Sequence, residues 1–134
     1  MTTEHDAGFR RMAAAGALSA ATAVALGAFG AHGLRGSLAP DMLEVYETAA
    51  RYQMYHALGL VAAAVAGLGH RADPRRAWWA CLGFVTGTLL FSGSLYALAL
   101  TGMRALGAVT PAGGLAFIAA WLFFAASFHG TARG

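Results

Sequence analysis

The stretch that decides the fold is MAAAGALSAATAVALGAFGAHG, residues 12–33, which follows Arg10 and Arg11 and carries no charged side chain. A helix of this length rises about 1.5 Å per residue and is roughly 33 Å long, enough to cross a bilayer. A secretory signal peptide is the alternative, because a basic pair precedes the apolar run, but its apolar region usually has only about 7–15 residues. We therefore expect a retained membrane-spanning helix.

Three further apolar stretches follow at 52–69, 77–100 and 106–128, separated by short charged breaks. Hydrophobic residues make up 58% of the chain and charged residues 11%, against about 45–50% and about 25% in an ordinary soluble domain. These values predict one all-α membrane domain over residues 1–134, a polytopic four-helix bundle with spans at about 12–33, 52–69, 77–100 and 106–128. The single cysteine, Cys81, lies inside an apolar run and can form no internal disulfide.

The segment between the first two spans is polar and has helical periodicity. Its apolar positions Leu38, Met42, Val45 and Ala49 follow the i, i+4, i+7, i+11 rhythm of one helix face. The pattern predicts a short amphipathic helix that lies on the membrane surface between spans 1 and 2. Its charged residues would then face water: Arg35, Asp41, Glu44, Glu47 and Arg51.

The arginines predict how the chain is threaded. With four spans, both ends of the chain and the second loop share one side of the membrane, and that side carries six arginines against three on the other. The positive-inside rule then places both termini in the cytoplasm. The six are Arg10, Arg11, Arg71, Arg75, Arg76 and Arg133, and the three are Arg35, Arg51 and Arg104. They are scattered and form no basic stripe, so we expect no nucleic-acid partner.

Small residues form stripes on two spans. Gly59, Ala63 and Gly67 share one face of the second, and Gly83 and Gly87 form a GxxxG pair in the third. Helices in lipid associate through such small residues. The stripes predict close helix packing, either within one chain or in a homo-oligomer or larger membrane complex.

Four ordered blocks carry a resemblance to a known family. They are GAFGAHGL at 27–34, YQ with HAL at 52–58, LFSGSLY at 90–96, and TP with GG at 110–114 followed by Trp121. In this order they resemble domain-of-unknown-function family 423, the YgdD-like small inner-membrane proteins. The resemblance implies a short multi-pass protein of a bacterial inner membrane, and it implies no activity.

Polar residues of these blocks converge on the outer leaflet under the inferred threading. The candidate cluster consists of His32, Gln53, His56, Ser94 and Tyr96. Polar groups at membrane depth usually face the protein interior and are the default place to look for function. The main interpretation is structural, with hydrogen bonds that tie helix ends together. The alternatives are a haem held by His32 and His56 as axial ligands, or a lipid site.

The sequence favours a structural or interaction component, an accessory subunit or a homo-oligomer, over an enzyme. We identify no catalytic residue, and a metal site lacks a third protein ligand at the depth of the two histidines. Transport is disfavoured because no Asp, Glu or Arg lies within a predicted span. We expect no cofactor, with haem or lipid binding through the outer-leaflet cluster as the alternative.

Overall fold

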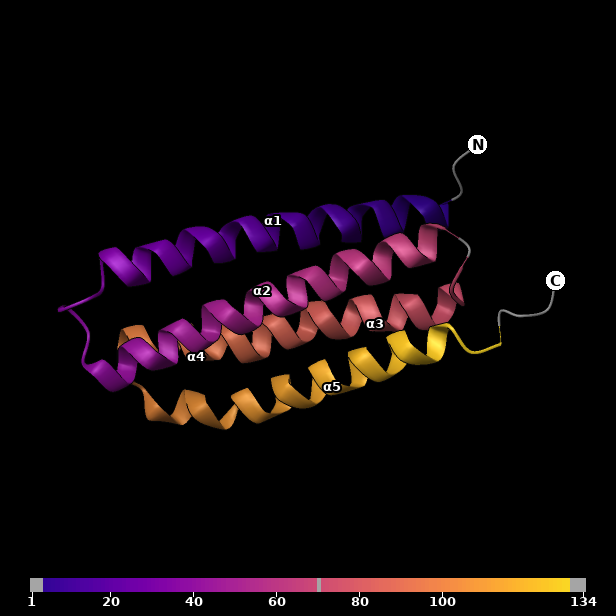
Figure 1. Cartoon of the computed structure of the whole chain (residues 1–134). Helices are drawn as coiled ribbons and strands as arrows, with labels where there is room; N and C mark the ends of the chain where they lie inside the picture. Colours follow the sequence, from indigo (N-terminus) through magenta and orange to yellow (C-terminus); the bar gives the residue numbers. More distant parts are fainter. Residues whose placement is uncertain (1–3, 70, 131–134) are drawn as a thin grey trace.

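Four helical rods lie side by side and antiparallel in the computed structural model, which describes residues 4–69 and 71–130 (Figure 1). The first two rods are α1 (Glu4–His32) and α2 (Pro40–Leu68). The third consists of α3 (Pro74–Gly87), a π-helical turn (Thr88–Ser92) and α4 (Gly93–Thr101). A 3-10 turn (Arg104–Ala108) leads into the fourth, α5 (Thr110–Ser127). The predicted all-α four-helix bundle is confirmed.

The separate surface helix predicted within 34–51 is wrong. Residues 40–68 form one continuous helix of 29 residues, which begins at Pro40. The chain has no glycine or proline between Pro40 and Gly59 that would break it. The inward side of its polar half is buried in the bundle at Tyr46, Ala49 and Gln53, so this half packs beside the other rods instead of lying across the membrane surface.

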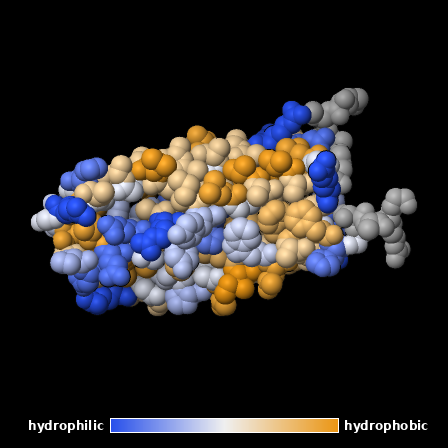
Figure 2. Space-filling model, viewed as in Figure 1, coloured by the Kyte–Doolittle hydropathy of each residue, from blue (hydrophilic) through white to orange (hydrophobic). Residues whose placement is uncertain are grey.

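Three of the rods are long and apolar enough to cross a bilayer: α1, residues 74–101 and residues 104–127. Their outer surfaces expose large apolar side chains, such as Leu18 at 69% and Leu115 at 69%. The first half of α2 is polar, and α2 is not among these three. Figure 2 shows the result, an apolar surface with a hydrophilic patch that extends inward from one end of the bundle.

Glycines set how closely the rods approach. A Cβ on Gly67 would lie 2.4 Å from the Phe9 ring, and one on Gly87 would lie 2.3 Å from the Phe117 ring. Gly59 and Gly83 likewise meet other rods of the same chain. Both predicted stripes therefore serve packing within the bundle, as small residues do between helices in lipid.

The π-helical turn brings the third rod against the start of α5. The Gly93 N–H donates to the Thr88 carbonyl, which widens the turn by one residue. Phe91, inside this turn, approaches Gly113 so closely that a Cβ there would lie 2.4 Å from the Phe91 backbone nitrogen. Before the turn the rod packs mainly on α5, and after it mainly on α2.

Candidate functional site

A buried amide at the centre of α2 joins three rods. The Gln53 side-chain Nε2 donates to the Ser19 carbonyl of α1 at 3.0 Å. Its Oε1 accepts a hydrogen bond from the Tyr96 hydroxyl of α4 at 2.7 Å. Both ends of the amide are thus used, and the side chain is only 6% exposed. Gln53 acts as a bridge between helices.

Further hydrogen bonds extend from this bridge. The Tyr46 hydroxyl donates to the Leu26 carbonyl at 2.8 Å, and the Ser92 hydroxyl donates to the Ala49 carbonyl at 2.8 Å. The Ser94 and Thr110 hydroxyls lie 2.7 Å apart and link α4 to α5. We call these side chains the polar belt: Ser19, Tyr46, Gln53, Ser92, Ser94, Tyr96 and Thr110.

The polar belt leaves no buried group unpaired. Within residues 4–69 and 71–130, every buried side-chain nitrogen or oxygen has a hydrogen-bond partner. An unpaired polar group in an apolar interior is costly, and each bond between helices in lipid contributes about 0.6 kcal/mol on average. The belt therefore holds the four rods in register.

His56 lies among aromatic rings beside the belt. Its Nδ1 is 2.6 Å from the Tyr52 carbonyl, and its ring stacks on Phe117 with centroids 3.4 Å apart and planes 6° apart. Tyr52 in turn stacks on Phe91. Nδ1 is the proton-bearing nitrogen in this arrangement, because a carbonyl can only accept. The stack fixes the imidazole between α2 and α5.

His32 is far from His56. Gln53 bonds to Ser19 and a Cβ on Gly16 would lie 3.0 Å from the Ala57 carbonyl, so His56 lies beside residues 16–19 of α1. His32, at the exposed end of α1, is then about 20 Å away along the helix axis. The predicted equal depth of the two histidines is wrong because α2 begins at Pro40 and places His56 in its middle. The pair does not fit a haem, whose two axial ligands bind one iron.

Of the predicted cluster, Gln53 and Tyr96 are hydrogen-bonded to each other, Ser94 joins the belt through Thr110, and His56 packs beside it. Sequence reasoning missed the other members as site residues. Ser19 and Ser92 lie in apolar runs, and Tyr46 lies in the segment that was predicted to face water. The one available signal for Tyr46 was its place between Val45 and Ala49 in a helix that no residue breaks.

A charged strip lies on the outward face of α2, between α1 and α5. Glu44, Glu47, Arg51 and Tyr55 are all exposed on this face. Figure 2 shows a hydrophilic patch that extends from the same end of the bundle toward its middle, with apolar surface beyond it. The side chains of Glu47 and Arg51 make no ion pair or hydrogen bond with any residue in the described part of the chain. These unpaired charges lie beside an apolar rod, α1.

A hollow of about 430 Å³ lies beside the strip, between α1 and α2. Its α1 wall is made by Ala23 and Gly27, in the middle of the uncharged stretch 12–33. A Cβ on Gly27 would meet no atom within 4 Å, so this wall is open. The α2 wall holds Glu47, Ala50, Arg51, Met54 and Tyr55.

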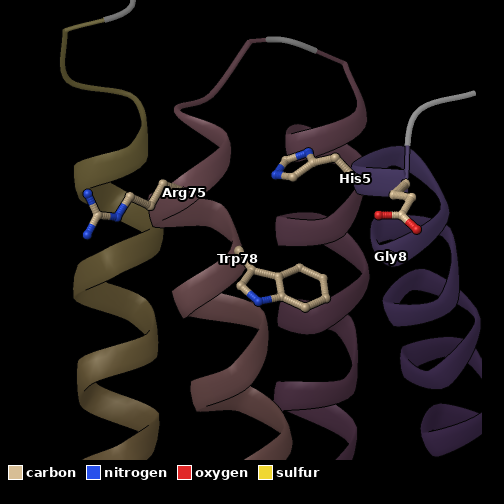
Figure 3. A pocket seen from close by; sticks show the side chains of 5 residues that line it. His5, Gly8, Arg75 and Trp78 are labelled. Carbon is tan, nitrogen blue, oxygen red and sulfur yellow. The ribbon is translucent and has the colours of Figure 1, made fainter.

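A second hollow, of about 520 Å³, lies at the opposite end of the bundle, where α1 and α3 begin. It is lined by Glu4, His5, Gly8, Arg75 and Trp78. In Figure 3 the Trp78 indole reaches across toward α1, whereas the Arg75 side chain points toward α5 and away from His5. The charged groups do not converge on one point, so this hollow is packing space at an aromatic interface.

Comparison with known proteins gives one family and a set of bacterial relatives. The model of a family described as "Protein of unknown function (DUF423)" matches residues 26–114, a range that holds every member of the polar belt except Ser19. A UPF0382 membrane protein of Staphylococcus haemolyticus is 50% identical over 107 residues, 80% of this chain and 85% of the relative. The UPF0382 membrane protein YwdK of Bacillus subtilis is 46% identical over 112 residues, 80% and 86% of the two chains. No solved structure matches.

Proposed function

Because the chain belongs to the DUF423 family, as its ordered sequence blocks predicted, and its relatives are bacterial UPF0382 membrane proteins, we propose that it is a structural or interaction component of the bacterial inner membrane. It acts as a homo-oligomer or as an accessory subunit of a larger complex. The belt keeps the rods in register, and an outward face of the bundle meets the partner.

The charged strip on α2 carries this proposal. Glu47 and Arg51 lie beside Ala23 and Gly27, which belong to the uncharged run of α1. A charge at the centre of a membrane helix costs up to about 2.5–3.5 kcal/mol on insertion scales, and such charges usually face protein or water-filled cavities. A protein partner that covers the strip would remove this cost by pairing both charges.

In the proposed threading α2 crosses the membrane in addition to the three apolar rods, which makes four spans, and both termini are cytoplasmic. Figure 1 supports it, because the N-terminal end of α1, the loop before α3 and the end of α5 lie together at one end of the bundle. This end carries Arg10, Arg11, Arg75 and Arg76, as the positive-inside rule requires for a cytoplasmic side. Arg133 lies outside the described residues.

The threading predicts which introduced cysteines a membrane-impermeant maleimide can reach in intact cells. Ser37→Cys, in the loop between α1 and α2, is labelled in intact cells, whereas Arg75→Cys is labelled only after permeabilisation. Both positions are exposed, so access depends on the side of the membrane. The native Cys81 is fully buried and serves as the unlabelled background. The reverse pattern would contradict the threading.

The function itself is tested by purifying the tagged full-length chain from native membranes in mild detergent and weighing the particle by native mass spectrometry. We expect a mass above that of one chain, either from further copies or from another protein. A single chain that comes out alone, at several detergent concentrations, would overturn the proposal.

Lipid binding is the second candidate function, and one observation favours it. The hollow beside Arg51 opens on the lipid-facing surface of the bundle, where a guanidinium can meet a lipid phosphate. The same mass spectra report it as a lipid that remains bound to a single chain.

A further inference from the structure

We propose that the partner of the charged strip is the same strip on a second copy of this chain. In this parallel two-fold dimer, Arg51 of each copy enters the hollow of the other and pairs with the other copy's Glu47. The inference rests on the proposed function, and it names both the partner and the contact. Its support comes from depth, charge and shape.

Depth restricts which residues can meet. Two copies inserted with the same orientation are related by an axis along the membrane normal, so each residue faces the partner's residues at its own depth. Arg51 and the small residues Ala23 and Gly27 line one hollow and therefore share a depth. The hollow of one copy thus lies opposite Arg51 of the other.

The lean of helical side chains brings the opposite charges together. Side chains on a helix point toward its N-terminus, and the arginine side chain is longer than that of glutamate, so the Arg51 guanidinium is carried toward the level of the Glu47 carboxylate, one turn earlier on α2. Across a two-fold axis this contact occurs twice. The two carboxylates and two guanidiniums then form two crossed ion pairs.

Charge favours a second copy over a lipid headgroup. The strip offers both signs, and neither Glu47 nor Arg51 is paired within the part of the chain that the structure describes. A phosphate would suit Arg51, but it would lie beside the Glu47 carboxylate, which lines the same hollow. A second copy can pair both charges, whereas a phosphate can pair only Arg51.

Shape agrees with charge. The open wall at Gly27 leaves room for an incoming side chain, since a Cβ there would meet nothing within 4 Å. The glycine stripes on α2 and α3 are already filled by Phe9, Phe84, Ala120 and Phe117 of the same chain. The hollow beside the strip is therefore where small residues of α1 remain open to a partner.

Charge reversal tests the contact in the full-length protein, reconstituted in lipid nanodiscs and weighed by native mass spectrometry. The wild-type protein gives a dimer. Glu47→Arg makes positions 47 and 51 both positive in each copy, and Arg51→Glu makes them both negative, so each variant alone is expected to lose the dimer peak. When the two variants are co-expressed with tags of different mass, the mixed dimer is expected to form.

The mixed dimer is the decisive result, because a variant that failed to fold could not be rescued by another chain. Glu4→Arg is the control: it makes the same substitution at an exposed position at the opposite end of the bundle, away from the charged strip, and it should keep the dimer.

Dimer loss in Glu4→Arg equal to that in Glu47→Arg would overturn the inference, as would a dimer that persists in both Glu47→Arg and Arg51→Glu. A single chain whose bound lipid is lost in Arg51→Glu would favour a headgroup instead. An assembly with a different protein, unaffected by these changes, would overturn the dimer and leave the proposed function standing. A protein that is always single and alone would overturn both.

Discussion

Replacing Gly113 with alanine is expected to destabilise the bundle by about 3 kcal/mol, at the upper end of what overpacking costs. The added Cβ would lie 2.4 Å from the backbone nitrogen of Phe91 and 2.8 Å from its Cα. Backbone atoms cannot rotate away as a side chain can. The start of α5 must therefore move off the π-helical turn, which also separates the Ser94 and Thr110 hydroxyls.

The measurement is unfolding of the purified protein in mixed micelles with increasing denaturing detergent. Gly114→Ala is the matched control, because the nearest atoms to its Cβ are 3.9 Å away, an ordinary contact. Alanine is the better helix former by about 1 kcal/mol, so this variant should be as stable as the wild type or slightly more stable. Equal unfolding curves for the two variants would show that the close approach does not limit stability.

Replacing Gln53 with leucine is expected to cost about 1–2 kcal/mol, because two hydrogen bonds between helices are lost at about 0.6 kcal/mol each and their partners lose a buried contact. The Tyr96 hydroxyl loses its acceptor and the Ser19 carbonyl loses its donor. Tyr96→Phe removes one of these bonds and should cost less. The free energies of unfolding of both variants and of the double variant give a double-mutant cycle.

The cycle should be non-additive, because Tyr96→Phe removes nothing further once Gln53 is absent. Thr22→Val is the control: among the described residues the Thr22 hydroxyl bonds only to the Leu18 carbonyl of its own helix, so its loss should leave the bundle nearly unchanged. Additive costs for Gln53→Leu and Tyr96→Phe would mean that their hydrogen bond contributes nothing to stability.

Apolar length was enough to predict the helices, because a bilayer admits few other structures. It was not enough for α2. Polar residues before Tyr52 were taken to lie in water, although Tyr46 in this segment is 1% exposed and donates to α1. The sequence shows that a face is polar, but it does not show whether that face meets water, another helix or a second protein.

The candidate site divides in the same way. Gln53 and Tyr96 were predicted to share a leaflet because the ends of their spans fix their depth, and they are in contact. His32 was predicted to lie near His56 because the second helix was expected to begin at Tyr52. This helix begins twelve residues earlier, at Pro40, so His56 lies in its middle. Ser19 and Ser92 can form their hydrogen bonds only because each rod is rotated about its axis so that these residues face another helix. A nearly uniform Ala-rich or Leu-rich run does not show this rotation.

The π-helical turn at Thr88–Ser92 has a consequence for how this chain tolerates change in length. A π-helical turn contains one residue more than an α-helical turn. The extra residue rotates the side chains of α4 about the helix axis by about 100° relative to an uninterrupted α-helix. A single-residue deletion there would keep the rod intact and turn Tyr96 away from Gln53. A deletion or insertion within this rod therefore changes which side chains of α4 face α2. Homologues that differ in length at this turn should differ in their contacts to α2 as well.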